Sequence, residues 1–371
     1  MSRRGHGEGT IYQRGPRQWC AMVTIGYDEA GRRKRRAVYG KTQEDVRQKL
    51  HKLQHQAASG ISIAVHRQTL AEFLDRWLND VAKLRVKPTT FFTYEWHTRK
   101  HIKPRIGGVQ LTKLTPLHIQ NLYSRMIEEG ASPRACQHVH VILHVALEEA
   151  LRWGLVPRNV CDAVRKPKAP RKAAQALTAE QVTKFLDTAK SDRLHALYVL
   201  ATTTGLRQGE LLGLQWSDVD LKVASLTIRH NLVEIRGKCW LDEPKTAGSR
   251  RSVVLTRTAV QALKDHRRRL LAEGHHARQV FCDTEGGFIR KSNLTRRSFK
   301  PLLKLAGVPE IPFHNLRHTA ATLLLSMGVH PKVVQEMLGH THISTTMDVY
   351  SHVLPSMQKE AAEKMEALLR K

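Results

Sequence analysis

Short apolar runs alternate with polar ones through the first 60 residues, which is the pattern of β-strands. Segments 10–13 and 19–25 are rich in β-branched and aromatic residues, and a third run ends at Tyr39. Glycine and aspartate separate these runs, so we predict a three-stranded antiparallel sheet. From Thr42 to about Gln56 the apolar residues recur at helical spacing. Residues 1–60 are therefore expected to form a small sheet backed by one helix.

A helical period with clear start signals covers residues 64–165, after a linker-like segment at 59–66. Thr69 and Glu72 form a capping box ahead of an apolar run. Thr115 and Ser132 each precede a proline, which is the arrangement of a capping residue followed by proline at the first helical position. About four helices are expected, and the one that opens at Pro88 is expected to be broken by Pro104 and by Gly107–Gly108. We predict a separate all-α domain.

The segment 165–172 is basic, contains two prolines and lacks large apolar residues, so we interpret it as an extended linker. A further capping box at Thr178 and Gln181 opens a third region, 172–371. Its pattern is helical to Trp216, alternating from about Val223 to Leu255, and helical again from Ala259. The fold class expected for the chain is multidomain and mainly α with small β-sheets, with an α+β third domain.

The net charge of the chain indicates the kind of partner that it binds. Lys plus Arg number 61 against 33 for Asp plus Glu, which gives +28 and a pI of about 10.3. A basic surplus spread along the chain indicates a polyanionic partner, with nucleic acid ahead of an anionic membrane surface. No apolar run reaches the roughly 20 residues of a membrane span. The N-terminus lacks a secretory apolar region, and five scattered cysteines suggest reduced thiols, so a cytoplasmic protein is expected.

Candidate cationic groups lie in the third region. Arg207 follows a glycine break between two apolar helices, where helix-end amide groups also face an anion. Glu210 is placed to pair with it. Lys245 lies in a basic segment between strand-like runs, which suggests a hairpin with a basic tip. His314 and Arg317 are spaced i, i+3 at the start of a helix, so one face could present an imidazole and a guanidinium to a phosphate.

The histidine patterns in the sequence do not match those of known metal sites. His138, His140 and His144 recur on one predicted helix without a cysteine or carboxylate in the motif, so we interpret them as surface or DNA-facing histidines. The pair His314 and His318 lacks the glutamate of an H-E-x-x-H motif. No phosphate-binding G-x-x-x-x-G-K-[ST] loop is present. Neither a metal nor a cofactor is therefore expected.

Tyr350 lies ten residues after His340 among small polar residues. A phenol with a pKa near 10 attacks usefully only beside groups that stabilise negative charge and accept its proton. A phosphodiester is an electrophile that suits such groups, because two arginines can clamp its non-bridging oxygens. An ammonium can protonate the leaving 5′ oxygen, and an imidazole can accept the phenol proton.

The ordered set Arg207, Lys245, His314, Arg317, His340 and Tyr350 resembles that of the tyrosine recombinases, the phage integrase family. Three stretches carry the likeness: 203–211 (TTGLRQGEL), 314–319 (HNLRHT) and 338–353, which contains LGH, TT and YSHV. The resemblance is strong over about 172–355 and looser over the helical domain, which resembles a core-binding domain of SAM-like fold. Residues 1–60 are similar to arm-type DNA-binding domains of integrases.

The resemblance implies a mechanism and partners. Tyr350 would attack the scissile phosphate to give a 3′-phosphotyrosyl bond and a free 5′ hydroxyl. Arg207 and Arg317 would stabilise the phosphorane with His340, His314 would accept the proton, and Lys245 would act as general acid. Four protomers on double-stranded DNA would exchange strands through a Holliday junction, with accessory DNA-bending or directionality factors as further partners. A nucleoid-associated cytoplasmic protein follows.

Three alternatives to an integrase of a phage or integrative element stay open. They are a Xer-like resolvase of chromosome or plasmid dimers, a type IB-like topoisomerase, and a catalytically retired DNA-binding regulator on the same fold. The arm-like N-terminal region argues against the first, and the complete set of six residues argues against the last. The tail after Pro355 has apolar residues at helical spacing. It could pack on its own domain or on a neighbouring protomer.

Overall fold

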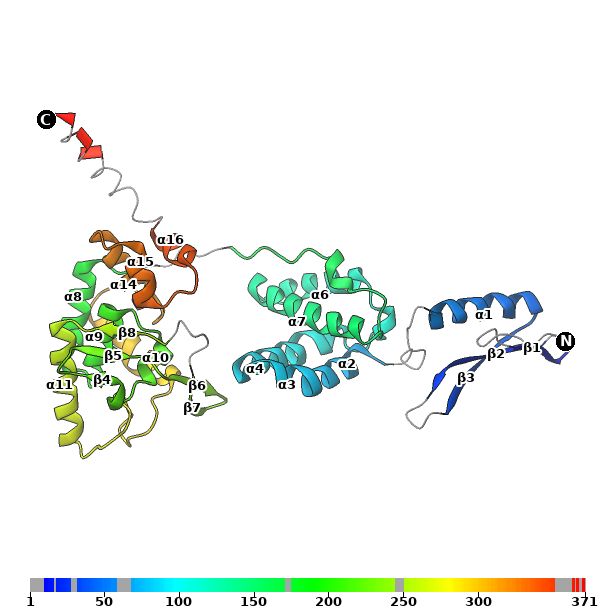
Figure 1. Cartoon of the computed structure of the whole chain (residues 1–371), viewed down its shortest axis with the longest axis horizontal. Helices are drawn as coiled ribbons and strands as arrows, with labels where there is room; N and C mark the ends of the chain where they lie inside the picture. The colour runs from blue at the N-terminus through cyan, green and yellow to red at the C-terminus, as the bar shows by residue number, and fades with distance from the viewer. Residues whose placement is uncertain are drawn as a thin grey trace. The chain divides into compact units, whose positions relative to one another are not determined.

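The chain forms two compact units, 1–171 and 172–371, whose boundary lies in the basic segment 165–172 (Figure 1). The computed structural model describes residues 10–16, 18–27, 32–58, 68–170, 175–243, 250–350, 362–363, 365–366 and 369–370. Described residues 165–170 have no regular secondary structure, as expected of an extended linker. The fold is mainly helical with small antiparallel sheets, which confirms the predicted fold class.

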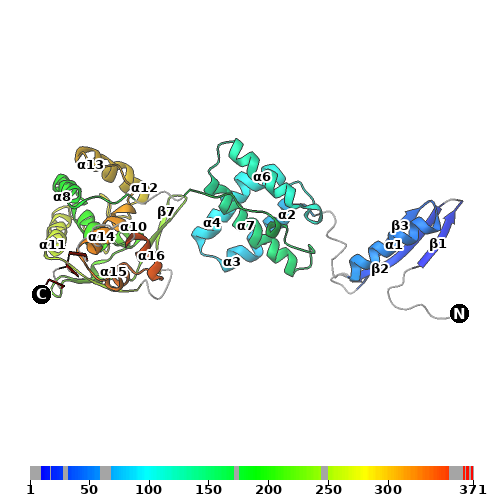
Figure 2. The ribbon, with the colours of Figure 1, turned by 90° about the horizontal axis from the view of Figure 1, so that it is seen from above.

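A three-stranded antiparallel sheet opens the first unit, as predicted. Its strands are β1 (Thr10–Gly15), β2 (Gln18–Tyr27) and β3 (Arg33–Gly40), paired in that order. Helix α1 (Gln43–Ala58) packs along the sheet (Figure 2). Val46 and Leu50 of α1 meet Ala21 and Val23 of β2 in a small core. Four buried apolar side chains can contribute only modestly to stability.

The rest of the first unit is helical. Its helices are α2 (Leu70–Trp77), α3 (Lys83–Arg85), α4 (Pro88–His97), α5 (Lys103–Ile106), α6 (Pro116–Glu128) and α7 (Pro133–Arg152). Thr69, Thr115 and Ser132 cap α2, α6 and α7 through their side-chain oxygens, as the sequence predicted. Helices α2, α5, α6 and α7 bury apolar side chains in one core, which includes Trp77, Tyr123 and Leu143.

Of the two predicted break points in the helix that opens at Pro88, Pro104 is wrong, whereas Gly107–Gly108 is where the helix ends. A π-helical turn, Thr98–Ile102, joins α4 to α5, and Pro104 lies in the first turn of α5. Proline lacks the N–H that would bond the carbonyl of Lys100. The Arg105 guanidinium donates to that carbonyl instead, over 3.1 Å. The helical path therefore continues and ends only at Gly107.

The second unit combines helices with two small sheets. Its helices are α8 (Ala179–Thr188), α9 (His195–Thr204), α10 (Gln208–Leu212), α11 (Arg257–Ala272), α12 (Lys291–Asn293), α13 (Lys300–Leu305), α14 (Asn315–Ser326), α15 (Pro331–Leu338) and α16 (Ile343–Tyr350). Helix α9 is buried along most of its length and packs against α11 and α14. The core around it therefore fixes the turn that follows α9.

The strands of the second unit are β4 (Val219–Asp220), β5 (Ser225–Thr227), β6 (Asn231–Ile235), β7 (Lys238–Asp242) and β8 (Ser252–Val254). Among the described residues, β8 pairs with β5, and β7 pairs with β6. The prediction of one hairpin around residues 243–251 is therefore wrong. This segment connects two sheets, and residues 244–249, with Lys245, lie outside the described part of the chain.

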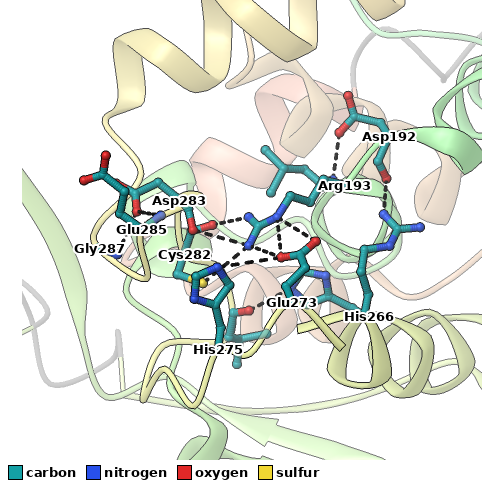
Figure 3. A network of polar contacts seen from close by, with 12 residues as sticks. Asp192, Arg193, His266, Glu273, His275, Cys282, Asp283, Glu285 and Gly287 are labelled. Atoms are coloured by element: carbon teal, nitrogen blue, oxygen red, sulfur yellow. Dashed lines mark hydrogen bonds and ion pairs between the residues drawn. The ribbon is translucent and has the colours of Figure 1, made fainter. Parts of the chain in front are cut away.

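A polar network fastens the start of α9 to α11 and the turn at 282–287 (Figure 3). Arg193 donates to both carboxylate oxygens of Glu273, at 2.9 and 3.2 Å from Nε. It also donates to the carbonyl of Cys282. Arg269 of α11 returns a bond to the Asp192 carbonyl over 3.0 Å. These contacts hold the segment before α9 to α11 and to the turn at 282–287.

Within the described residues, no helix has the length and apolar character that crossing a membrane requires. All five cysteines are free, in keeping with the expected reduced thiols. His140 bonds the Tyr123 hydroxyl over 2.9 Å, and His144 pairs with Asp162 over 3.0 Å. A carboxylate therefore does accompany these histidines, but it comes from a neighbouring turn, and each imidazole has a structural partner.

Candidate active site

Arg207 caps the start of α10 and is held by that helix, as the sequence predicted. Its Nη1 donates to Glu210 Oε1 over 2.7 Å, and its backbone N–H donates to the other carboxylate oxygen over 3.0 Å. Its Nη2 donates to the Gly339 carbonyl over 3.1 Å. The Arg207 side chain keeps 37% of its surface exposed. It is therefore fixed in place and still reachable from solvent.

Arg317 lies on α14 and is nearly buried, with 3% of its surface exposed. Its Nη1 donates to the Gly205 carbonyl over 2.9 Å, at the turn that ends α9. Its Nη2 has no hydrogen-bond partner among the described residues. Burial and the nearby Arg207 lower the pKa of Arg317 to about 9, so the guanidinium is still charged at neutral pH. A buried cation with an unused donor calls for an anion.

Gly205 makes this approach possible. It adopts a left-handed conformation with φ +62°, and a Cβ there would lie 2.3 Å from a methyl carbon of Leu338. Only glycine adopts that conformation at low cost. The Thr-Gly-Leu-Arg run of the sequence thus ends α9, supplies a carbonyl to Arg317 and aims Arg207 in a single turn.

His314 and His340 supply the imidazoles. His314 is the residue before α14, and its ring lies 5.2 Å from that of His318, centroid to centroid. Partial burial, then His318 and Arg317, lower the pKa of His314. His340 bonds the Thr346 hydroxyl through Nδ1 over 2.9 Å. Burial and the nearby arginines lower the pKa of His340 to about 4. Both rings are therefore neutral at physiological pH.

The structure brings four of the six predicted residues into one neighbourhood: Arg207, His314, Arg317 and His340. His314 is the N-cap of α14, and the Arg317 N–H in the first turn donates to its carbonyl over 3.1 Å, so the two residues share one helix start as expected. His314 is exposed and Arg317 is buried. Tyr350 is the last residue of α16, whose start is tied to His340 through Thr346. Its side chain and all of Lys245 fall outside what the structure describes.

Arg251 belongs to the same cluster, and the sequence analysis did not assign it. Its Nη2 donates to Glu210 over 3.0 Å, and its Nε donates to the Met337 carbonyl over 2.8 Å. Only 8% of its side chain is exposed. The preceding Arg250 is 60% exposed and pairs with Glu243. The one available signal was the strand alternation after Arg251, which places one member of the Arg250–Arg251 pair inward.

The site as a whole suits a phosphodiester. The guanidiniums of Arg207 and Arg251 contact the buried carboxylate of Glu210, and that of Arg317 lies near it. Three positive charges therefore stand against the one negative charge of Glu210. The two imidazoles are neutral and can donate or accept a proton. Such an arrangement stabilises charge that gathers on phosphoryl oxygens.

Comparison with known proteins gives the same class. The sequence profile of the phage integrase family matches residues 175–357, and that of the N-terminal SAM-like domain of phage integrases matches residues 69–127. A protein of Caldanaerobacter subterraneus subsp. tengcongensis named "Tyrosine recombinase XerC-like" is 31% identical, over 95% of this chain and 97% of its own length. An integrase of Saccharopolyspora erythraea is 26% identical over 98% and 97% of the two chains.

Solved structures agree on the fold. The Tn1549 transposon integrase in complex with a circular intermediate DNA superposes with a TM-score of 0.69 at 22% identity, over 80% of this chain and 99% of that one. A lambda integrase dimer bound to a COC′ core site gives 0.60 at 20% identity, over 94% and 96%. The fold and the cluster of arginines and histidines define a tyrosine recombinase. This chain belongs to the phage integrase family.

Proposed function

We propose that this protein is a site-specific DNA recombinase that integrates or excises a mobile element through a 3′-phosphotyrosyl intermediate. The observation that carries the proposal is the buried Arg317, whose Nη2 has no partner among the described residues, next to the fixed guanidinium of Arg207. Membership of the phage integrase family supports it. Relatives include integrases of Mycobacterium phages and the transposase of transposon Tn916.

The proposed chemistry begins when the scissile phosphate occupies the space between the two arginines. The Tyr350 oxygen attacks phosphorus, and its proton passes to the neutral His314. The 5′ oxygen leaves as a hydroxyl with a proton from Lys245. Because the tyrosyl ester replaces the DNA ester, a second 5′ hydroxyl can reverse the step and join a new strand.

Arg207, Arg317 and His340 stabilise the phosphorane in this scheme. Their donors are fixed before DNA arrives, by Glu210, by the Gly205 and Gly339 carbonyls and by Thr346. Preorganised donors need little rearrangement as charge develops, which is the main source of catalysis at such sites. Side chains supply all the positive charge in the scheme, so we propose that cleavage proceeds in EDTA.

We propose the following division of labour along the chain. Residues 1–60 bind arm-type DNA sites, residues 64–165 bind the core site, and residues 172–371 carry out catalysis. The partner is double-stranded DNA, and the working form is a homotetramer on two DNA segments. Both expectations draw on relatives, since a lambda integrase tetramer has been solved on a Holliday junction. The protein would act in the cytoplasm, on chromosomal or element DNA.

A resolvase of chromosome or plasmid dimers is the second candidate, because one relative carries the name XerC-like. The two functions differ in their DNA. An integrase should recombine the junctions of the element that encodes it, whereas a resolvase should recombine two copies of one site far from that gene. Recombination assays on both kinds of DNA distinguish them.

Covalent trapping tests the enzyme class. A duplex from the element junctions is nicked beside the scissile phosphate, so that the short 5′-hydroxyl strand diffuses away. Wild type should give a protein–DNA adduct in EDTA, and Tyr350→Phe should give none. For both proteins, the logarithm of the DNA association constant should fall linearly with the logarithm of the salt concentration. Absence of an adduct with wild type, or an adduct with Tyr350→Phe, would overturn the proposal.

A further inference from the structure

Two arginines share the buried carboxylate of Glu210, and each also donates a hydrogen bond to a backbone carbonyl at the end of α15. Arg207 joins Glu210 to the Gly339 carbonyl, and Arg251 joins it to the Met337 carbonyl. We call Glu210, Arg207 and Arg251 the Glu210 cluster. It connects α10, the residue before β8 and the turn that leads into His340.

The cluster is closely fitted around Arg251. Gly339 has φ +67°, and a Cβ there would lie 2.8 Å from Arg251 Nη1. A guanidinium at the carboxyl end of α15 also interacts favourably with the helix dipole. Arg251 therefore fixes the backbone of residues 337–339, immediately before His340.

Arg251 also weakens the attraction between the Glu210 carboxylate and Arg207, because it neutralises part of the carboxylate charge. Burial raises the pKa of Glu210, and the contacts from Arg251 and Arg207 more than offset this, so that its pKa is lowered overall. Without Arg251, the whole charge of the carboxylate would draw on Arg207, the guanidinium proposed to hold the phosphate. The charged groups facing Glu210 are Arg207 on α10, Arg251 before β8 and Arg317 on α14.

We infer that Arg251 is a positioning residue for strand cleavage, which shares Glu210 with Arg207 and anchors the turn before His340. It does not touch DNA in this role. The inference rests on the proposed function, because it concerns the rate of the cleavage step. It assigns to the basic 243–251 segment a second task beside that of Lys245.

The test compares Arg251→Met with Arg250→Met in the full-length chain. Both changes remove one arginine, but Arg250 is exposed and lies outside the Glu210 cluster. Single-turnover adduct formation is measured on the nicked duplex, together with DNA affinity and thermal unfolding. Arg251→Met should cleave roughly 100-fold more slowly, the loss expected from misplacing a catalytic group by about 1 Å. The DNA affinity of Arg251→Met should stay within about twofold of wild type. For Arg250→Met, both the cleavage rate and the DNA affinity should stay within about twofold of wild type.

Two further readouts separate positioning from general loss of structure. In Arg251→Met the acid limb of the cleavage rate should move to higher pH, because burial then raises the pKa of Glu210. Adding Arg251→Met to a Glu210→Gln chain should slow cleavage by clearly less than the roughly 100-fold expected in the wild-type chain. The shared carboxylate charge is already gone there, and only the anchor to the Met337 carbonyl is left to lose. If Arg251→Met does not fold, Arg251→Lys replaces it. Lysine keeps the charge but cannot contact Glu210 and the Met337 carbonyl together, so cleavage should still fall about tenfold.

The outcomes are distinct. If wild type forms no adduct, the proposed function fails. If wild type forms it and Arg251→Met or Arg251→Lys cleaves at the wild-type rate, the inference about Arg251 fails alone. Multiplicative effects of Arg251→Met and Glu210→Gln, with an unmoved acid limb, would also overturn it.

Discussion

Gly205→Ala is expected to destabilise the second unit in two ways, through backbone strain and through a steric clash of the added methyl group. An alanine at φ +62° costs about 1–2 kcal/mol in the left-handed conformation. Its Cβ would also lie 2.3 Å from a methyl carbon of Leu338, which is fully buried and would have to shift. Overpacking of this kind costs about 1–3 kcal/mol. The free energy of unfolding should therefore fall by about 2–5 kcal/mol.

Gly328→Ala is the matched control. Gly328 has φ +78° in the same unit, but a Cβ there would meet nothing within 4 Å. Its loss should be the backbone cost alone, about 1–2 kcal/mol. Urea unfolding of the full-length variants, with hydrogen exchange in α9 and α14 to assign the transition, measures the difference. Equal losses for the two variants would refute the steric argument.

Gly205→Ala should also slow cleavage, since the Gly205 carbonyl accepts a hydrogen bond from Arg317 over 2.9 Å. Movement of the turn would displace Arg317 and Arg207 together. Adduct formation per folded molecule should fall by about tenfold or more, while Gly328→Ala should retain the wild-type rate. Unchanged cleavage in Gly205→Ala would mean that this turn does not set the guanidinium positions.

His266, His314 and His340 have lowered pKa values, about 4 for His340 against an ordinary 6.5, so the unfolded chain binds more protons between these values. The DNA-free protein should thus lose stability as pH falls from about 6.5 towards 4, which urea midpoints at pH 7.5 and 5.5 measure; equal midpoints would contradict the assignment. Arg193→Met should lower the free energy of unfolding by about 1.5–3 kcal/mol through loss of its bonds to Glu273, without changing cleavage per folded molecule; a specific cleavage defect would place this network in the active site. Lys245→Ala should cleave slowly on normal DNA and at nearly the wild-type rate when sulfur replaces the 5′ bridging oxygen, because a thiolate leaves without a proton; an equal defect on both substrates would exclude Lys245 as general acid.

Helix starts were predictable because their signals are local. Thr69, Thr115, Ser132 and Thr178 each bond a backbone N–H three residues on, and that contact needs no tertiary partner. Helix continuation past Pro104 was not predictable. It depends on a π-helical turn and on Arg105, whose long side chain satisfies a carbonyl that local rules leave open.

The site residues also fall into two groups, those that local sequence signals predict and those that depend on contacts between distant parts of the chain. Arg207 could be found from its glycine break and its spacing to Glu210, since both act within a single turn. The partner of the second Glu210 oxygen comes from 41 residues later in the chain. Strand alternation can place one member of the Arg250–Arg251 pair inward, but sequence spacing does not predict its contact with Glu210. The hairpin prediction failed for a related reason. Strand-like runs flank residues 243–251, but pairing is decided by contacts with β5 and β6.

The chemical identity of the covalent adduct tests the central claim most directly. Wild-type protein is trapped on the nicked duplex, the complex is digested with protease and nuclease, and the linked peptide is sequenced by mass spectrometry. The account predicts a 3′-phosphate ester on Tyr350, and a released strand whose 5′ end is a hydroxyl that polynucleotide kinase labels directly. An adduct on another residue, or a 5′ end that requires phosphatase before labelling, would contradict it.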